Sequence, residues 1–184
     1  MRLRRTAAGI VLVSVALLGL PQGARASDFA TQPCANPQIP AAILAGQAAR
    51  HDSSQMPVIV ARAGRVALQL AVADSEHRRE LGLMCVTALR PRSGMLFVFA
   101  TDAVQTFWMK NTLIPLDMVW VRDDGLVTTV AGDVPASTLA TPDDAVARRT
   151  GRGRYVIELA AGEARRAGIA AGARVFVPRK GYER

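Results

Sequence analysis

GMLFVFATDAVQTFWMKNTLIPLDMVW, the stretch from Gly94 to Trp120, decides the fold of this chain. Large apolar side chains dominate it, so most of the segment must be buried. Among them stand Lys110, Asn111, Thr112 and Asp117. Burying an unpaired charge is costly, so the ammonium and the carboxylate must be paired, hydrated or used. If the domain has a functional site, we expect it among these polar residues.

The same stretch predicts three strands. Met95–Phe99 is apolar on both alternating faces, as in a strand that is buried on both sides. A second apolar run covers Val104–Lys110, and a third covers Leu116–Arg122 after Pro115. Side chains alternate along a strand, so Asp117 shares a face with apolar neighbours.

The rest of the chain predicts short strands and two short helices. A helix over residues 75–83 is expected with Asp74 as its N-cap, and a second over residues 162–167 ends at Gly168. Residues 131–153 read as a long loop. The sequence Asp123-Asp124-Gly125 is typical of a hairpin turn. The further strands are expected at residues 58–60, 66–72, 126–130, 155–159 and 174–177.

These elements lack a regular alternation of strand and helix. We therefore expect an α+β fold, mostly antiparallel β: a compact, partly closed barrel or sandwich of seven to eight strands with two short helices. Residues 57–180 are expected to form this single β-rich domain. Residues 27–56, rich in Ala, Gln, Pro and Ser, are expected to form a flexible N-terminal arm.

Residues 1–26 have the pattern of a secretory signal peptide. Arg2, Arg4 and Arg5 precede an apolar run too short to span a bilayer, and Ala24-Arg25-Ala26 matches an A-x-A cleavage site. Its removal leaves 158 of the 184 residues and lowers the net charge from +8 to +4. We expect an exported protein, periplasmic or extracellular, with no transmembrane segment after cleavage.

The chain has two cysteines, Cys34 and Cys85, and export would place them where disulfides persist. A bridge between them would close a loop of about 50 residues and stabilise the fold by about 4 kcal/mol. Two free thiols, or Cys34 on a disordered tail, are the alternatives.

Standard catalytic signatures are absent from the sequence, which has only two histidines. The best constellation combines Lys110, Asn111, Thr112 and Asp117 with Trp108, which suggests a pocket for a small molecule or a sugar. In the competing interpretation, Asp117 accepts hydrogen bonds from the backbone of Asn111 and Thr112 and braces the turn at Pro115. Neither a metal site nor a cofactor is predicted.

Two other functions remain open. A hydrolase or transferase acting on an envelope carbohydrate or peptide would use Asp117 as general acid or base, aided by Lys110, with Glu80 or Asp133 as the second acid. A copper-binding protein would use thioether ligands. The methionines of the central region are Met84, Met95, Met109 and Met118, and core packing is the commoner use of such residues.

Nucleic acid is not an expected partner. Arg148, Arg149, Arg152 and Arg154 cluster in the sequence, but no aromatic residues are interleaved among them for base stacking. A solvated charged loop is the simpler interpretation.

Several motifs together resemble the family known as domain of unknown function 192. The resemblance covers residues 66–178 and implies a small, β-rich domain that is often exported, with no established activity. It transfers no catalytic role. The motifs are GLM at Gly82–Met84, GMLFVF at Gly94–Phe99, FWMKNTLIPLDMVWV at Phe107–Val121, the Asp124-Gly125 turn, and YVIELAAGEARRAGIAAGARV at Tyr155–Val175.

The sequence as a whole favours an exported binding or envelope-associated module. Its partner would be a small molecule, a glycan or an envelope protein.

Overall fold

The computed structural model describes Ile39, residues 42–44 and residues 56–179 of the chain. The predicted signal peptide, Cys34 and most of the predicted arm lie outside these residues. The elements are β1 (Val58–Ala63), β2 (Val66–Ala73), α1 (Glu76–Leu81), β3 (Ser93–Trp108), β4 (Leu116–Val121), β5 (Val127–Val134), β6 (Arg148–Ala160), α2 (Glu163–Arg166) and β7 (Val175–Phe176).

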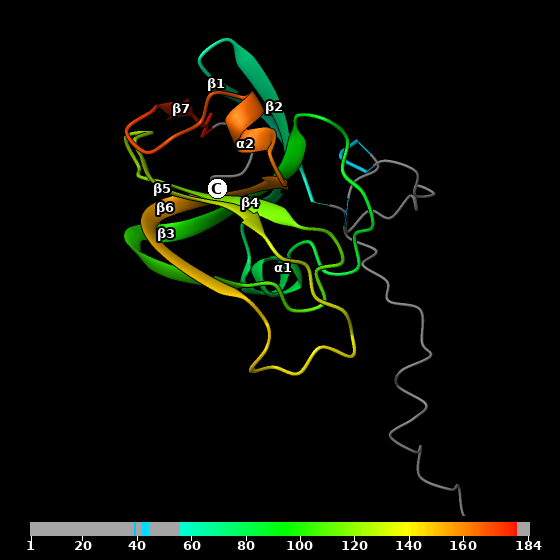
Figure 1. The fold of residues 1–184 in the computed structure, drawn as a ribbon. Helices are drawn as coiled ribbons and strands as arrows, with labels where there is room; N and C mark the ends of the chain where they lie inside the picture. The colour runs from blue at the N-terminus through cyan, green and yellow to red at the C-terminus, as the bar shows by residue number, and fades with distance from the viewer. Residues whose placement is uncertain (1–38, 40–41, 45–55, 180–184) are drawn as a thin grey trace, which may run out of the picture. The chain divides into compact units, whose positions relative to one another are not determined.

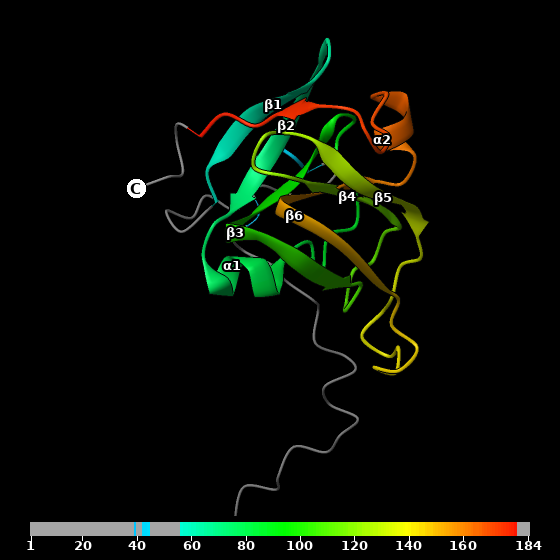
Figure 2. The ribbon, with the colours of Figure 1, turned by 90° about the vertical axis from the view of Figure 1, so that its left-hand side faces the viewer.

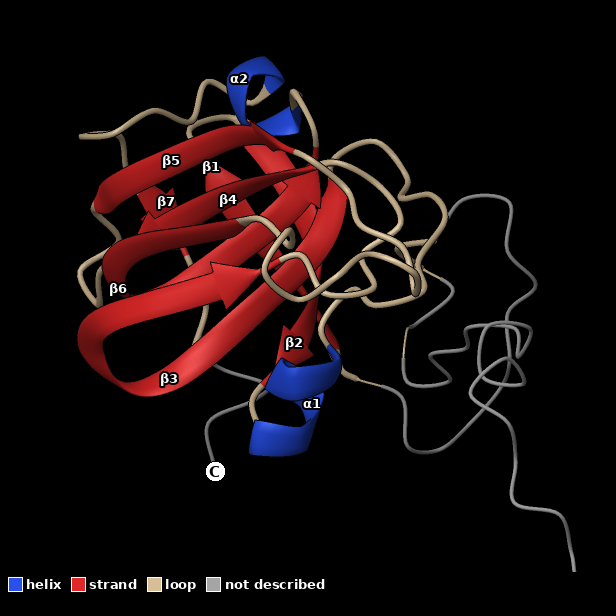
Figure 3. Cartoon of the chain, turned by 60° about the horizontal axis from the view of Figure 1, so that its bottom comes forward, coloured by secondary structure: helices blue, strands red, loops and turns tan. Residues whose placement is uncertain are grey.

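The seven strands form one mixed sheet in the order β5-β4-β6-β3-β2-β1-β7. Every neighbouring pair is antiparallel except β2 and β3, which run parallel with α1 between them in the chain. The two ends of the sheet meet at a bridge between Leu126 and Arg174, where Val127 N–H donates to the Ala173 carbonyl at 2.9 Å. The sheet therefore curls into a half-barrel (Figure 3), and the predicted fold class is confirmed.

Apolar side chains cover both faces of the sheet. In β4, Val119 and Val121 belong to an inner cluster with Leu96 and Ile157. The alternate residues of β4 belong to an outer cluster, which also includes residues after α1 together with Ile43 and Leu44. Helices α1 and α2 lie at opposite ends of the half-barrel (Figures 1 and 2). Burial on both faces explains the apolar runs in the first half of β3, in β4 and in the second half of β6.

Helix α1 begins one residue later than predicted. Its N-cap is Ser75, whose side chain accepts the backbone N–H of Arg78, and the predicted cap, Asp74, instead forms an ion pair with Arg78 at 2.8 Å. Helix α2 begins at Gly162 as its N-cap, and Gly168 beyond its end has φ +68°, as predicted. In the part of the chain that the structure describes, no helix has the length and apolar character needed to cross a bilayer.

The predicted loop over residues 131–153 is wrong at both ends. Strand β5 continues to Val134, and β6 begins at Arg148, so the connection covers only residues 135–147. The first residues of β6 show no strand pattern in the sequence, because they are mostly arginines and glycines. Gly151 is required there: a Cβ at this position would lie 2.5 Å from Trp120 Cδ2. The clustered arginines therefore lie on a strand that pairs with the second half of β3.

Candidate functional site

The Asp117 carboxylate is buried and accepts two backbone hydrogen bonds. It is 2 % exposed, and its two oxygens accept the backbone N–H groups of Asp133 and Ala164, each at 2.9 Å. The prediction that Asp117 accepts backbone hydrogen bonds is therefore correct, but the predicted donors, Asn111 and Thr112, are wrong. Nothing in this arrangement brings Asp117 to Lys110.

The end of β3 turns sharply at the Lys110-Asn111-Thr112 sequence. Asn111 has φ +50°, a left-handed conformation that Asn tolerates better than most residues. Its carbonyl accepts the N–H of Cys85 at 2.9 Å, which fixes the segment after α1 against this turn. Thr112 is buried, and its hydroxyl donates to the Lys110 carbonyl at 3.2 Å. The turn residues therefore position the backbone on which Lys110 stands.

The connection 135–147 holds the other side of this turn. Ser137 N–H donates to the Thr112 carbonyl at 2.8 Å, and the Ser137 hydroxyl donates to the Met109 carbonyl. The Lys110 ammonium forms an ion pair with Asp143. The hydrogen bond from Lys110 lowers the pKa of Asp143. Because Asp143 is exposed, this pair orients Lys110 but contributes little to stability.

Trp108 projects from the end of β3 and is 44 % exposed. Two cations lie close to its ring: Lys110 Nζ is 6.0 Å from the ring centroid, and Arg148 Cζ is 5.8 Å from it. Cations at such distances are attracted to the ring face. The result is an exposed aromatic surface with positive charge beside it.

A small cleft of about 30 Å³ opens beside Trp108. Its lining includes Lys110 and Thr112 from the turn after β3, and residues 79–84, which end α1 and include the GLM motif. Phe97 and Phe107, whose rings meet edge to face at 4.8 Å, also line it. We call this the Glu158 cleft after the acid that completes its lining.

Glu158 is the most unusual residue of the cleft. It lies near the C-terminal end of β6, faces the outer cluster between Met95 of β3 and Met118 of β4, and is 4 % exposed. Burial raises the pKa of its carboxyl to about 8. Because of this raised pKa, the carboxyl is mostly neutral at pH 7. Among the described residues, no hydrogen bond or ion pair involves it, so it can still donate and accept hydrogen bonds.

Of the four central methionines, only Met84 lines the cleft. Met95, Met109 and Met118 are fully buried in the outer cluster, whereas Met84 is half-buried and lines the cleft. Within the described ranges, no three His, Cys, Asp or Glu side chains converge as metal ligands.

Residues 58–177 match the family model of DUF192, described as uncharacterized ACR. The chain belongs to this family. A search of curated proteins found no match.

Two solved structures resemble this DUF192 domain, each with a TM-score of 0.57. The first is a putative transcription regulator from Sinorhizobium meliloti, 31 % identical, which covers 65 % of this chain and 93 % of its own. The second, a protein of unknown function from Novosphingobium aromaticivorans, is 28 % identical and covers 69 % of this chain and 90 % of its own.

The cleft combines predicted and unpredicted residues of this DUF192 domain. Trp108, Lys110 and Thr112 line it as part of the predicted constellation, while Asn111 contributes through its backbone. Sequence reasoning missed Glu158. The sequence does contain a sign of it: Glu158 is an acid inside the apolar run Tyr155–Leu159, just as Asp117 is an acid inside an apolar run.

Proposed function

We propose that this protein is an exported binding domain whose Glu158 cleft receives one hydroxyl or amide group of a glycan. The observation that carries the proposal is the unpartnered, buried carboxyl of Glu158 beside the exposed ring of Trp108. A ligand group that enters the cleft would supply the missing partner.

The cleft's chemistry suits an uncharged, hydroxyl-bearing ligand. A neutral carboxylic acid both donates and accepts hydrogen bonds, as a sugar hydroxyl does. Trp108, which is 44 % exposed, offers an aromatic ring against which a sugar ring can lie, with Lys110 Nζ 6.0 Å from the ring centroid. A cavity of about 30 Å³ holds one small group, so the rest of the glycan would lie along Trp108 outside it.

The test is a fluorescence titration with neutral oligosaccharides, among them the trimers of N-acetylglucosamine, glucose and mannose. Trp108 is exposed while Trp120 is buried, so Trp108 is the tryptophan that a bound sugar would perturb. We expect saturable binding that weakens at least tenfold in Glu158→Met, which keeps the volume and removes the carboxyl. Glu76→Gln, an exposed acid of α1, is the matched control and should bind normally.

Two results would count against the proposal. One is the absence of binding across the oligosaccharide panel at millimolar concentration. The other is binding that Glu158→Met leaves unchanged, because the carboxyl would then have no part in recognition.

A hydrolase or transferase is the second candidate, and one observation favours it. Glu80 and Glu158 both line the cleft, as two carboxyl groups do in glycoside hydrolysis. A neutral acid of raised pKa is suited to protonate a leaving group. In this candidate mechanism, Glu158 takes the role of general acid that the sequence suggested for Asp117, because both Asp117 oxygens accept backbone hydrogen bonds. Product release from the same oligosaccharides, lost in Glu158→Gln, would separate catalysis from binding.

Export and the disulfide belong to the same proposal. The charged, apolar and small-residue regions of residues 1–26 support secretion. Cys85 is not a free thiol in the described part of the chain, and Cys34 is the other cysteine of the sequence. A bridge between them would tie the predicted arm to the segment that forms one wall of the cleft.

A further inference from the structure

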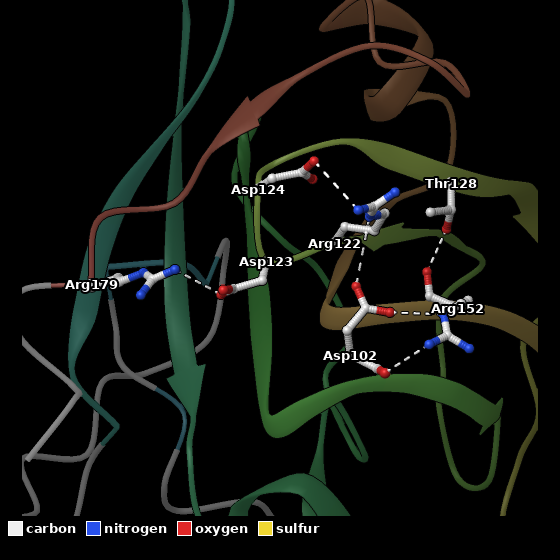
Figure 4. Close-up of a pocket in the computed structure, with 7 residues that line it drawn as sticks. All are labelled: Asp102, Arg122, Asp123, Asp124, Thr128, Arg152 and Arg179. Carbon is white, nitrogen blue, oxygen red and sulfur yellow. Dashed lines mark hydrogen bonds and ion pairs between the residues drawn. The ribbon is translucent and has the colours of Figure 1, made fainter.

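A second hollow lies at the β4–β5 turn and shares no lining residue with the Glu158 cleft. It is a cavity of about 400 Å³, within the size range of small-molecule sites. A wider hollow of about 810 Å³ (Figure 4) adjoins it. Asp123, Asp124 and Arg179 line both hollows. We call the smaller one the Tyr155 pocket. The lining residues that matter here are Gly125, Tyr155, Arg174, Phe176, Val177 and Arg179.

The Tyr155 hydroxyl is the first sign of a ligand. Tyr155 lies in β6, is 2 % exposed and lines the pocket. Its hydroxyl is buried and has no hydrogen-bond partner within the described residues. Leaving such a group unpaired is unfavourable, and phenylalanine would fill the same space without that penalty. A polar ligand atom in the pocket would satisfy this hydroxyl.

Two carboxylates beside the hollows, Asp123 and Asp102, each form ion pairs with two arginines. Asp123 binds Arg154 at 2.7 Å and Arg179 at 2.9 Å. The hydrogen bond from Arg154 lowers the pKa of Asp123, so it stays ionised. In the adjoining hollow, Asp102 lies between Arg122 and Arg152 (Figure 4). Asp102 Oδ1 has no hydrogen-bond partner among the described residues, but each of the two acids already faces two guanidinium groups, which disfavours a cationic ligand.

Two arginines, by contrast, keep unused donors. Arg174 donates to the Asp124 carbonyl at 2.8 Å, and no described carboxylate forms an ion pair with it. Arg122 is 3.9 Å from Asp102 and 3.7 Å from Asp124, which is longer than a hydrogen bond. A guanidinium carries five N–H donors in a planar fork that matches an oxyanion. The free donors of the two hollows therefore favour a negatively charged group.

The third feature is an apolar wall next to Arg174. Phe176 is 66 % exposed although it lies in β7, and Val177 follows it. Both line the Tyr155 pocket. An exposed aromatic ring beside a guanidinium with spare donors suits a ligand that has an apolar part and a charged end.

We propose that the Tyr155 pocket binds a small amphiphilic oxyanion, with its head group on Arg174 and the Tyr155 hydroxyl and its apolar part against Phe176. The head group is a carboxylate or a phosphate, since both present oxygens that a guanidinium recognises. This binding is independent of any glycan in the Glu158 cleft.

The experiment is calorimetric titration of the full mature chain with octyl phosphate, octanoate and inorganic phosphate, below the critical micelle concentration of each amphiphile. We expect submillimolar binding of at least one octyl compound, and the stronger of the two identifies the head group. Inorganic phosphate should bind at least tenfold more weakly, because it lacks the apolar part. Equal affinity for inorganic phosphate would overturn the amphiphilic part of the proposal.

Two variants test the residues. Arg174→Gln should weaken binding at least tenfold, and Tyr155→Phe should weaken it three- to tenfold without lowering the melting temperature. Arg165→Gln removes the same charge from an exposed position of α2 that lines neither hollow, and should bind like the wild type. Unchanged affinity in both Arg174→Gln and Tyr155→Phe, or no binding of either octyl compound at millimolar concentration, would refute the site.

Discussion

Asp117 caps helix α2 from a neighbouring strand. The N-cap position of α2 is Gly162, which has no side chain to accept the first N–H groups, and Asp117 Oδ2 accepts the N–H of Ala164 at 2.9 Å in its place. Its other oxygen accepts the N–H of Asp133, a residue with φ +54° in β5. One carboxylate thus joins β4, β5 and α2. We infer that Asp117 stabilises the fold rather than serving as a catalytic acid.

Replacing Asp117 should therefore destabilise the protein. Asp117→Ala leaves two N–H groups without acceptors and should lower the free energy of unfolding by about 2 to 5 kcal/mol. Asp117→Asn keeps one acceptor and should cost less. Urea denaturation measures both, with Asp144→Asn, at an exposed position of the connection, as the control. A loss below about 0.5 kcal/mol in Asp117→Ala would contradict the capping role.

Glu158 should make stability depend on pH. Its pKa is raised from the usual 4.5 to about 8 in the folded protein, so the folded state holds a proton that the unfolded state has lost between these values. Stability should then fall as pH rises from about 5 to 8, by up to about 1.4 kcal/mol per pH unit.

The variant Glu158→Gln isolates this contribution. It cannot ionise, so its unfolding free energy should decline less steeply over the same pH range, measured by urea denaturation at intervals of one pH unit. Parallel profiles for Glu158→Gln and the wild type would show that Glu158 does not titrate abnormally.

The contact between Gly151 and Trp120 predicts a sharp difference between two glycines. Gly151→Ala should destabilise by about 1 to 3 kcal/mol, because the new methyl group would overlap a fully buried ring. Gly132→Ala should change stability by no more than about 0.5 kcal/mol, since its nearest contact would be an ordinary 3.6 Å from Asp117 Oδ1. Thermal unfolding of the two variants checks the pair, and equal effects would contradict the packing described.

The proposed disulfide predicts a response to reductant. A bridge between Cys34 and Cys85 should leave no reactive thiol in the unreduced, denatured protein, and its reduction should lower the free energy of unfolding by about 4 kcal/mol. A thiol assay and denaturation with and without reductant measure the two effects. Two reactive thiols before reduction would exclude the bridge.

Local signals explain what the sequence predicts well. The β4–β5 hairpin follows from its apolar residues and the Asp124-Gly125 turn. Helix α2 ends at Arg166, two residues before Gly168, whose left-handed φ of +68° stops it from continuing. Pairing between distant segments explains the misses. The first half of β6 becomes a strand because β3 pairs with it, and the parallel pairing of β2 with β3 has no local signature.

The candidate site also combines residues that are close in the sequence with one that long-range strand pairing brings to it. Trp108, Lys110 and Thr112 stand in one conspicuous motif, so their proximity is predictable. Glu158 joins them only because β6 lies next to β3 and β4 and because the segment after α1 closes over that face. Its raised pKa depends on this burial, which the residue sequence alone does not determine.

The most direct test of the central claim is a carbon-13 NMR titration of the Glu158 carboxyl, assigned by comparison with Glu158→Gln. We predict an apparent pKa near 8 in the free protein, and a change in both chemical shift and pKa when a bound oligosaccharide occupies the Glu158 cleft. A pKa near the usual 4.5, unaffected by every oligosaccharide, would show that this acid is solvated and that the cleft is not the binding site.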